Sequence, residues 1–404
     1  MDVSSPAPRR VAHGGLTRFG HLVPELRERL FLREPASLRA AKSAADVGAA
    51  LGAVLYTPAT NAVLGRRLVD GHWPALTATV VCLEDAIGDH ELPEGEAQLG
   101  DLLSRYARAV EERGSRDDLP LLFVRVRSPG HLARLLDNLG SATGHLDGVV
   151  LPKFEPDTAD AYLDCVASRQ ASRDRPLWAM PILEGSAISY IETRRDALRA
   201  LNGTLSRHAA LIPCVRIGGT DISGTWGLRR SRDTSIYELA VVRDIIADIV
   251  NVLGRPGGVP AISGPVWEWF ADDRVFHPRL RETPFRKALG DTEGPAVRQE
   301  LLSNALDGLL HETLLDRANG LHGKSAIHPT HLLPIDAAHV VGADEWHDAQ
   351  SIVSSLREDQ GASASIHRTR MNEPKPHAVW ADRVIRRANA FGVLASGQSF
   401  LSLL

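Results

Sequence analysis

Charged side chains stand at or near the ends of short apolar runs in this 404-residue sequence. Carboxylates can hold a divalent cation or move protons, and arginine or lysine can bind the carboxylate of a small acid. If the runs are parallel strands of one barrel, their carboxyl ends meet at one face, and the charged residues would form one site there. The candidates, in chain order, are Glu84, Asp85, Arg125, Lys153, Glu184 and Asp221.

From Ala53 onward, the apolar runs alternate with longer amphipathic stretches. This pattern is typical of parallel strands that are buried on both faces and linked by helices. Eight such units between Ala53 and Ile327 span 275 residues, close to the roughly 250 of a typical (β/α)₈ barrel, and predict an α/β fold of this TIM-barrel type. The predicted strands are Ala53–Thr57, Ala78–Leu83, Leu121–Val126, Gly148–Leu151, Trp178–Leu183, Ile212–Ile217, Val259–Ile262 and Lys324–Ile327.

Three regions are expected along the chain. Residues 1–18 are rich in Pro, Ser, Arg and Gly without apolar periodicity, which predicts a flexible arm. The barrel domain takes residues 19–335, with a helical extension at its start and an insertion at 266–295. Residues 336–404 are expected to form a C-terminal helical extension that serves as a lid or an oligomerisation segment. Helices are predicted at Pro24–Phe31, Ser235–Leu253, Asp344–Leu356 and Ala378–Phe391.

Composition narrows the class of protein. Hydrophobic residues at 44% and charged residues at 24% are typical of globular proteins, and the net charge of −4 lacks the basic excess of a nucleic-acid binder. Cys82, Cys165 and Cys214 form no C-x-x-C pair, so we expect neither disulfides nor a thiolate zinc site. The sequence shows neither a signal peptide nor a run of about 18 apolar residues, which favours a cytoplasmic protein without a membrane partner.

Short motifs carry most of the charged candidates: Leu83-Glu84-Asp85-Ala86-Ile87, Val124-Arg125-Val126, Leu151-Pro152-Lys153, Glu184, Gly219-Thr220-Asp221, Gly323-Lys324 and Ile327-His328-Pro329. In this order they resemble the citrate lyase beta-subunit-like family of the HpcH/HpaI aldolase superfamily, over about residues 50–392. The segment Met371-Asn372-Glu373-Pro374-Lys375-Pro376-His377 and the N-terminal helix resemble a branch of carbon–carbon bond lyases associated with tellurite-resistance-type operons.

The resemblance implies a divalent metal, Mg²⁺ or alternatively Mn²⁺, held by Glu184 and Asp221. Such ions prefer hard oxygen ligands and leave positions to water and substrate. A 2-oxo acid would chelate the ion, and cleavage of the adjacent bond would pass through an enolate that Arg125 stabilises. Glu84 and Asp85 would orient metal-bound waters. The alternatives are carboxylates that only cap helices and an Arg125 that pairs structurally with Glu84 or Asp85.

Two further residues would give other chemistry. Lys153 could form a Schiff base with a carbonyl substrate, or it could simply bind a substrate carboxylate. Glu373 lies where relatives carry an acidic residue on a lid that reaches a neighbouring subunit's site. It would then be an acid or base, and the alternative is a solvated residue at a helix start. By the same resemblance we expect a homo-oligomer, either a trimer or a hexamer.

Substrate binding is assigned to Thr57, Pro58, Gly219 and Thr220, through hydroxyl groups and backbone amides. Relatives that use coenzyme A (CoA) thioesters tend to carry Arg-Ser before the first barrel strand, where this chain has Gly52-Ala53. We therefore do not expect CoA as a cofactor. The expected substrate is a 2-oxo acid condensed with, or released from, an aldehyde or a larger metabolite.

His322, His328 and His331 lie close together in the sequence, but we expect hydrogen-bonded structural residues rather than metal ligands. The sequence as a whole predicts a Mg²⁺-dependent carbon–carbon lyase or aldolase that acts on a 2-oxo acid or a beta-hydroxy acyl substrate. Two other functions remain open. One is a non-catalytic barrel that binds metal and a 2-oxo acid, and the other is a mutase or hydrolase of the phosphoenolpyruvate type.

Overall fold

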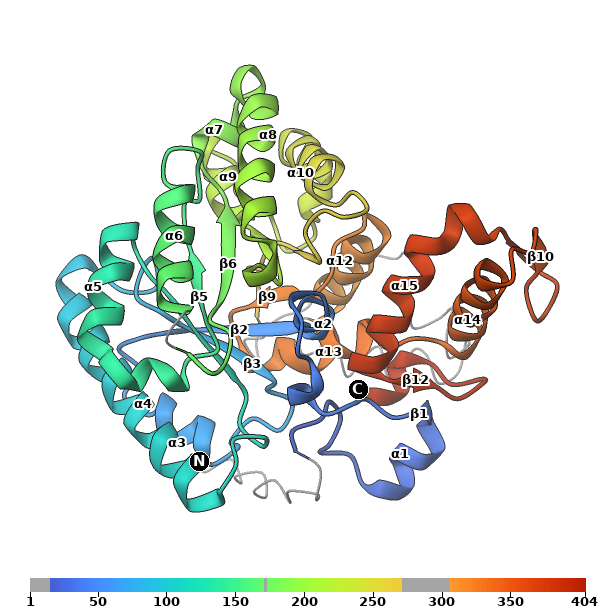
Figure 1. Ribbon diagram of the computed structural model, residues 1–404, viewed down its shortest axis with the longest axis horizontal. Coiled ribbons are helices and arrows are strands. Elements are labelled where there is room, and N and C mark those ends of the chain that lie inside the picture. Colours follow the sequence, from blue (N-terminus) through green and yellow to red (C-terminus); the bar gives the residue numbers. More distant parts are fainter. Residues whose placement is uncertain (1–14, 171–172, 271–305) are drawn as a thin grey trace.

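Parallel strands form the centre of the protein (Figure 1). The computed structural model describes residues 15–170, 173–270 and 306–404. Eight strands pair in the order β8-β7-β6-β5-β4-β3-β2-β9, and a parallel bridge between Gly264 and Lys324 joins the two ends of this order. The predicted TIM barrel is therefore confirmed. Its strands are β2 (Ala53–Pro58), β3 (Ala78–Cys82), β4 (Leu121–Arg125), β5 (Gly148–Leu151), β6 (Trp178–Leu183), β7 (Val215–Ile217), β8 (Ile262–Ser263) and β9 (Lys324–Ala326).

Helices follow the strands and cover the outside of the barrel (Figure 1). None of the helices in the described ranges combines the length and the apolar character needed to cross a membrane. The helices around the barrel are α3 (Leu64–Val69), α4 (Leu92–Arg113), α5 (Pro129–Leu139), α6 (Ala159–Gln170), α7 (Ser186–Ser189), α8 (Ile191–Arg207), α9 (Gly219–Thr225), α10 (Ala240–Leu253), α12 (Asp307–Ala318) and α13 (Leu332–Ala338).

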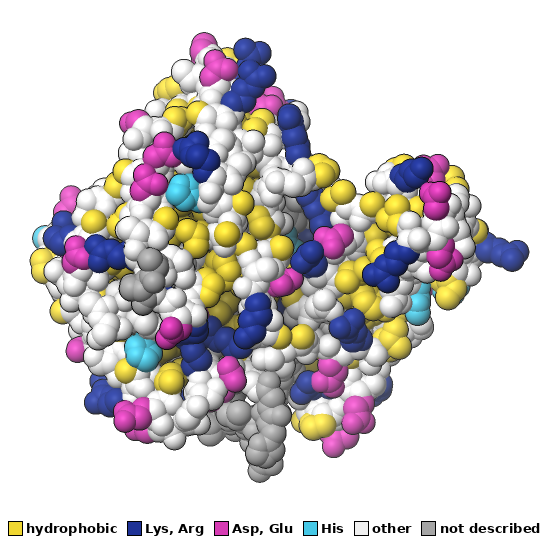
Figure 2. Space-filling view, viewed as in Figure 1, with side chains coloured by type: hydrophobic (Ala, Val, Ile, Leu, Met, Phe, Trp, Pro, Cys, Tyr) yellow, Lys and Arg dark blue, Asp and Glu magenta, His cyan; other side chains and the backbone are white. Residues whose placement is uncertain are grey.

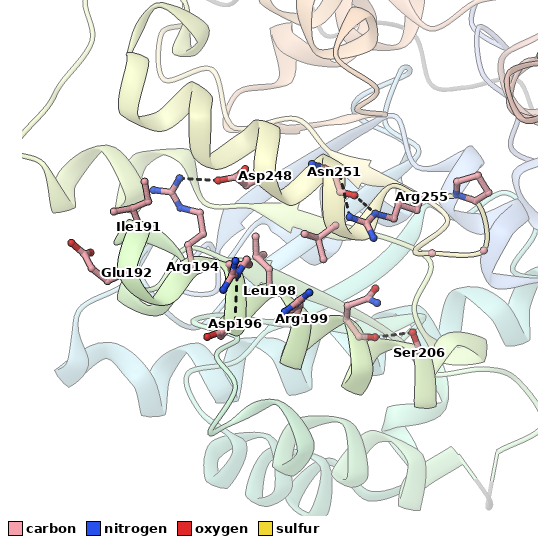
Figure 3. Close-up of a pocket in the computed structure, with 16 residues that line it drawn as sticks. Ile191, Glu192, Arg194, Asp196, Leu198, Arg199, Ser206, Asp248, Asn251 and Arg255 are labelled. Carbon is pink, nitrogen blue, oxygen red and sulfur yellow. Dashed lines mark hydrogen bonds and ion pairs between the residues drawn. The ribbon is translucent and has the colours of Figure 1, made fainter. Parts of the chain in front are cut away.

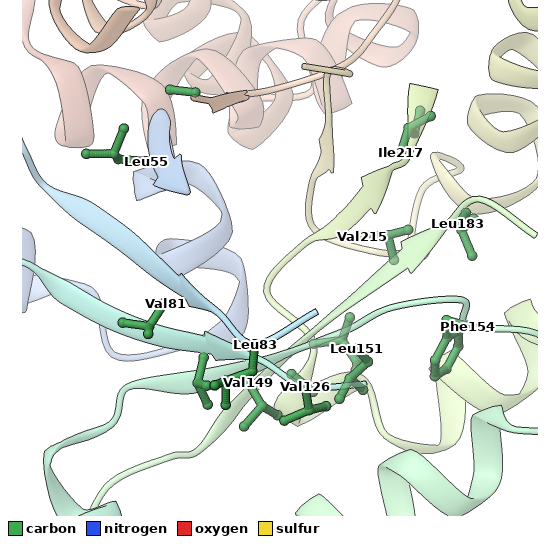
Figure 4. Packing of buried hydrophobic residues seen from close by; sticks show 14 of the residues in the cluster. Leu55, Val81, Leu83, Val126, Val149, Leu151, Phe154, Leu183, Val215 and Ile217 are labelled. Atoms are coloured by element: carbon green, nitrogen blue, oxygen red, sulfur yellow. The ribbon is translucent and has the colours of Figure 1, made fainter. Parts of the chain in front are cut away.

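Side chains alternate between two buried faces along each strand. Val54, Val80 and Phe123 belong to a cluster inside the barrel. Residues such as Leu55 and Val81 point the other way and pack under the helices, together with other outward-facing side chains (Figure 4). The alternation therefore decides which strand residues can reach the barrel axis. The inner set continues with Tyr56, Arg125, Glu184, Arg216 and Ser325.

Two strands begin later than predicted. Strand β7 begins at Val215 instead of Ile212, and β8 begins at Ile262 instead of Val259. Pro213 and Pro260 lie in the missing parts, and a proline cannot donate a hydrogen bond to the neighbouring strand.

The predicted helix Ser235–Leu253 is divided in two. A short 3-10 helix, η5 (Ile236–Glu238), precedes α10, and Leu239 between them is extended. The Ser235 side chain and the Glu238 carboxylate cap this first turn, and the buried Glu312 accepts a hydrogen bond from the Ile236 amide at 2.8 Å. The first turn is therefore fixed separately from the long helix.

The predicted flexible arm 1–18 is partly outside the described residues, which begin at Gly15. For residues 15–18 the prediction is wrong, because Leu16 and Arg18 are buried. The Arg18 Nε donates to Asp336 Oδ2 at 3.2 Å, and its guanidinium lies over the ring of Phe391. A buried, paired guanidinium ties this segment to the rest of the chain.

The C-terminal region packs against the amino ends of the barrel strands. The predicted boundary after residue 335 falls inside α13, so barrel and extension are continuous. Arg383 donates to the Gly254 carbonyl at 2.9 Å, and Arg386 pairs with Asp46 at 2.9 Å. Residues 271–295 of the predicted insertion lie outside the described residues. The remaining elements are α1 (Pro24–Leu30), β1 (Phe31–Arg33), α2 (Ala44–Ala50), α14 (Ala343–Arg357), β10 (Ser363–Ala364), β11 (Met371–Asn372), α15 (Pro374–Phe391) and β12 (Val393–Leu394).

His339, just after α13, provides a test of this packing. It is fully buried, its Nδ1 donates to the Ile335 carbonyl at 2.7 Å, and its Nε2 accepts from the Gly323 amide at 2.9 Å. Burial holds the pKa of His339 well below its usual value. In the unfolded chain, His339 binds a proton below about pH 6.5, whereas in the folded protein it stays neutral. The free energy of unfolding therefore falls as the pH drops below that value, by about 1.4 kcal/mol per pH unit.

We expect His339→Gln to reduce this acid dependence of the free energy of unfolding, measured by urea denaturation between pH 5 and 7. His72→Gln, at an exposed histidine, is the control and should leave the slope unchanged. If the free energy of unfolding depends equally on pH in the two variants, His339 is not a neutral imidazole held by two hydrogen bonds.

Candidate active site

Arg125 joins three carboxylates at the carboxyl end of the barrel. Its Nη2 lies 2.5 Å from Glu84 Oε2, 3.1 Å from Asp85 Oδ2 and 3.3 Å from Glu184 Oε1. The structural alternative, an Arg125 that pairs with Glu84 or Asp85, is present in the fold, and both carboxylates take part. Glu184 is an additional partner, so one guanidinium holds the ends of β3 and β6 together from β4.

The structure brings Glu184 and Asp221 together. Glu184 follows β6 and is 5% exposed, and Asp221 lies in the first turn of α9. Their carboxyl groups are within hydrogen-bonding reach of each other, and Glu184 Oε1 accepts from the Lys153 amide at 2.9 Å. A Cβ atom at Gly218 would lie 2.2 Å from Glu184 Oε2, so glycine at this position leaves the space that Glu184 occupies.

Negative charge exceeds positive charge in this cluster. Burial raises the pKa of Glu184 to about 7, with Arg125 opposing and Asp221 adding to the shift. Burial and then Asp85 raise the pKa of Asp221, and burial also raises that of Glu84. Among the described residues, these three carboxylates and Asp85 face two cations, Arg125 and Lys153, so the fully ionised carboxylates would exceed the cations by two charges. Such a site favours a divalent cation.

The donor set of Glu184 and Asp221 fits Mg²⁺ or Mn²⁺. Both are carboxylates, and Mg²⁺ is usually held by one or two carboxylates with other positions left to water and substrate. Within the described ranges, no group of three or more His, Cys, Asp or Glu side chains could hold a metal ion, so the candidate ligands here are a pair of carboxylates.

Lys153 contacts the cluster through both its side chain and its backbone. Its Nζ lies 3.1 Å from Glu84 Oε1, and its φ of 47° places it in the left-handed region. The hydrogen bond and charge of Glu84 raise the pKa of Lys153. A Schiff-base lysine needs the opposite shift, so the structure gives no support to that alternative.

The predicted substrate-binding residues are separated by the fold. Thr57 has the strand parity of Leu55, which faces the helices, whereas Pro58 is exposed at the end of β2. Gly219 is buried at the start of α9. Thr220 Oγ1 donates to Glu268 Oε1 at 2.7 Å, so its hydroxyl is committed to a protein partner.

Glu268 continues into a buried ionic network. Arg230 Nε donates to Glu268 Oε2 at 3.3 Å, and Arg230 also pairs with Glu312. Lys324 lies 2.9 Å from Glu312 Oε1 and 2.7 Å from Asp316 Oδ2, and its side chain is fully buried. The Gly323-Lys324 motif therefore fixes α12 to β9 on the outer face of the barrel, away from the cluster around Arg125.

The three histidines have the hydrogen bonds that we expected. His322 Nε2 lies 2.8 Å from the Ala49 carbonyl, His331 Nε2 lies 3.0 Å from the Trp269 carbonyl, and His328 Nδ1 lies 2.8 Å from Thr330 Oγ1. Burial lowers the pKa of His322 to about 3 and that of His331 to about 4.

Glu373 does not lie at the carboxylate cluster of the same chain. It precedes α15, and its amide donates to His377 Nδ1 at 3.1 Å. The last turns of α15 pack at the amino end of the barrel, opposite the cluster, and the β10–β11 hairpin that leads into α15 projects away from the barrel (Figure 1). Its assignment as an acid or base remains a prediction.

Sequence reasoning missed two polar residues inside the barrel, Tyr56 and Arg216. Arg216 is 1% exposed, its Nη2 donates to Ser325 Oγ at 2.8 Å, and its guanidinium lies 5.5 Å from the centre of the Tyr56 ring. A charged residue in the middle of the apolar run Ile212–Ile217 was the available signal. Arg216 does not close its run, so the strand-end positions do not indicate it.

Two surface grooves lie elsewhere. One, of about 730 Å³, runs between α8 and α10 and is lined by residues that include Arg194, Asp248 and Arg255 (Figure 3). The other, of about 900 Å³, separates the amino end of the barrel from α15, at the notch between the two lobes in Figure 2. Neither groove contains a residue of the carboxylate cluster.

A parallel barrel with an acidic cluster at the carboxyl ends of its strands defines a TIM-barrel enzyme. Residues 46–393 match the family described as C–C bond lyase of the TIM-barrel fold. The chain belongs to this family and is a carbon–carbon lyase. The search of curated proteins found no match.

Several solved structures are similar in fold. CitE from Mycobacterium tuberculosis, in complex with magnesium, acetoacetate and coenzyme A, has 18% identity and a TM-score of 0.49, covering 84% of this chain and 99% of that chain. The citrate lyase beta subunit from M. tuberculosis, complexed with oxaloacetate and magnesium, has 18% identity and a TM-score of 0.41 over 72% and 98%. RipC from Yersinia pestis has 16% identity and a TM-score of 0.41 over 72% and 95%.

The hydrogen bond from Thr220 to Glu268 should hold the turn that carries Asp221. Thr220→Val keeps the size of the side chain but removes the donor, so we expect the affinity for Mg²⁺ to fall by about tenfold, the lower end for loss of a group that orients a ligand. Thr143→Val removes a comparable hydrogen bond of a partly buried threonine outside the cluster, to the Gly140 carbonyl, and is the control. Titration calorimetry with MgCl₂ measures both, and unchanged affinity in Thr220→Val would contradict the positioning role.

Proposed function

We propose that this carbon–carbon lyase holds Mg²⁺ or Mn²⁺ through Glu184 and Asp221 and acts on a 2-oxo acid or a beta-hydroxy acyl substrate. The observation that carries the proposal is the convergence of these two carboxyl groups in a site with surplus negative charge. When bound, the ion supplies a Lewis acid that polarises the carbonyl group beside the bond that breaks.

Arg125 is the residue proposed to stabilise the developing enolate. Three carboxylates fix its Nη2, so the guanidinium cannot turn away from the cluster. Its Nε is buried and has no hydrogen-bond partner within the described ranges, which leaves a donor for a substrate oxygen. Glu84 accepts from both Arg125 and Lys153, so its proposed role is to position these two cations.

The proposed substrate is not a CoA thioester. Relatives with this substrate carry a cation before the first barrel strand, and this chain has Gly52 there. A Cβ atom at Gly52 would lie 2.1 Å from Asp336 Oδ1 and 2.9 Å from the Phe391 ring, so the fold leaves no room for a longer side chain. Titration calorimetry with CoA tests this, and tight binding would overturn it.

Replacing the proposed metal ligands tests the function. Glu184→Gln and Asp221→Asn remove one negative charge each, so we expect the affinity for Mg²⁺ to fall by more than about a hundredfold. Exchange of the pyruvate methyl protons with D₂O, followed by NMR, should stop in both variants. Asp89→Asn, at a fully exposed carboxylate that pairs with Arg127, is the matched control and should keep both properties. Wild-type exchange that survives excess chelator would refute the metal's role.

We also propose that Glu373 acts as the acid or base in the site of a neighbouring subunit of a trimer or hexamer. The support is its position on an extension that faces away from its own site. Asp221→Asn and Glu373→Gln chains should each be inactive alone, because each lacks one part of the site. Co-expressed chains should regain partial turnover in mixed oligomers. Mixtures as inactive as the separate variants would place Glu373 outside the reaction.

A further inference from the structure

We propose that Arg216, Tyr56 and Ser325 form a second anion subsite below the carboxylate cluster, which binds a distal carboxylate of the substrate. The substrate is then a dicarboxylic 2-oxo acid or a compound that contains one. This inference rests on the proposed function, because the cluster around Glu184 binds the other end of the same molecule.

The three residues come from three strands and share the inner face of the barrel. Arg216 lies on β7, Ser325 on β9 and Tyr56 on β2. Arg216 Nη2 donates to Ser325 Oγ at 2.8 Å, and its guanidinium is 5.5 Å from the Tyr56 ring centre. Burial raises the pKa of Tyr56, and the charges of Arg216 and Arg125 oppose that shift, so both guanidinium groups lie close enough to act on the Tyr56 hydroxyl.

Hydrogen-bond donors in this region lack acceptors. Arg216 Nε, Tyr56 Oη and Arg125 Nε are each buried without a hydrogen-bond partner in the part of the chain that the structure describes. Buried polar groups are nearly always paired, and an unmade bond costs about 1–3 kcal/mol. All three groups can donate, so the partner that satisfies them together must be rich in acceptors.

Charge points to an anion instead of a neutral acceptor. Arg125 and Lys153 are committed to carboxylates of the cluster. Arg216, in contrast, has no carboxylate within ion-pair distance in the described ranges, although it is only 1% exposed. A buried charge is stable only when it is paired. A bound carboxylate would supply the missing negative charge and accept from Arg216 and Tyr56.

The spacing sets the length of the ligand. Arg216 pairs in register with Ile182, and Glu184 lies two residues further along the chain, directly after the end of β6. Two residues of a strand span roughly 6–7 Å. A 2-oxo acid of four or five carbons, chelated at one end near Glu184, reaches this depth with its other carboxylate.

Matched pairs of ligands test the subsite in the full-length protein. With saturating Mg²⁺, titration calorimetry compares oxaloacetate with 2-oxobutyrate and 2-oxoglutarate with 2-oxopentanoate, which differ within each pair mainly by the distal carboxylate. We expect at least one dicarboxylate to bind about tenfold to a hundredfold more tightly than its partner. Arg216→Met should remove the difference and leave the affinity for Mg²⁺ unchanged, while Arg216→Lys should keep part of it.

The outcomes separate this inference from the proposed function. Failure of wild-type protein to bind Mg²⁺ would refute the proposed function and the inference with it. Normal binding of Mg²⁺ and pyruvate with equal affinities within both ligand pairs would refute the subsite alone. If phosphonopyruvate binds more tightly than either dicarboxylate, the subsite takes a phosphonate or phosphate group, and its assignment to a carboxylate is overturned. If Arg216→Met does not fold, Tyr56→Phe and Ser325→Ala remain, and unchanged discrimination in both would overturn the assignment.

Discussion

The contact of one arginine with three carboxylates is the constraint on which the site depends. Glu84, Asp85 and Glu184 would repel one another at these distances, and Arg125 makes their approach tolerable. The compensation is incomplete, since the pKa of Glu184 is still raised to about 7. The barrel therefore holds its acidic residues in a state that a divalent cation would relieve. That electrostatic state depends on all of these side chains together and not on any single one of them.

Much of the fold could be predicted from the sequence, because parallel strands that are buried on both faces consist of short runs of apolar residues. All eight predicted strands exist, and the errors occur where local chemistry competes with the pattern. Pro213 and Pro260 shorten two strands, and the cap at Ser235 separates a first turn from α10. The N-terminal segment misled in another way. Its composition is that of a flexible arm, but Arg18 is held by Asp336, far away in the sequence, and no local pattern reports such a partner.

The sequence indicated which charged residues lie together at the carboxyl end of the barrel, but it did not indicate most of their interaction partners. Strand-end positions indicated Glu84, Asp85, Arg125 and Glu184, because every parallel strand delivers its last residues to the same face. The committed hydroxyl of Thr220 could not be foreseen, since its partner Glu268 follows a different strand. Arg216 could have been found, because a charged residue with inner-face parity inside an apolar run must either be paired or bind something.

The pairing of the two chain ends has a consequence for biosynthesis. Strand β1 near the start of the chain pairs with β12 near its end, and Arg18 binds Asp336. During translation these early residues leave the ribosome long before their partners, since Arg18 and Asp336 are 318 residues apart. Until then, the nascent chain carries an unpaired cation and an open strand edge. The barrel strands can associate earlier, but the seal at their amino ends closes only when Asp336 and β12 have emerged, which exposes the shorter nascent chains to proteolysis and aggregation.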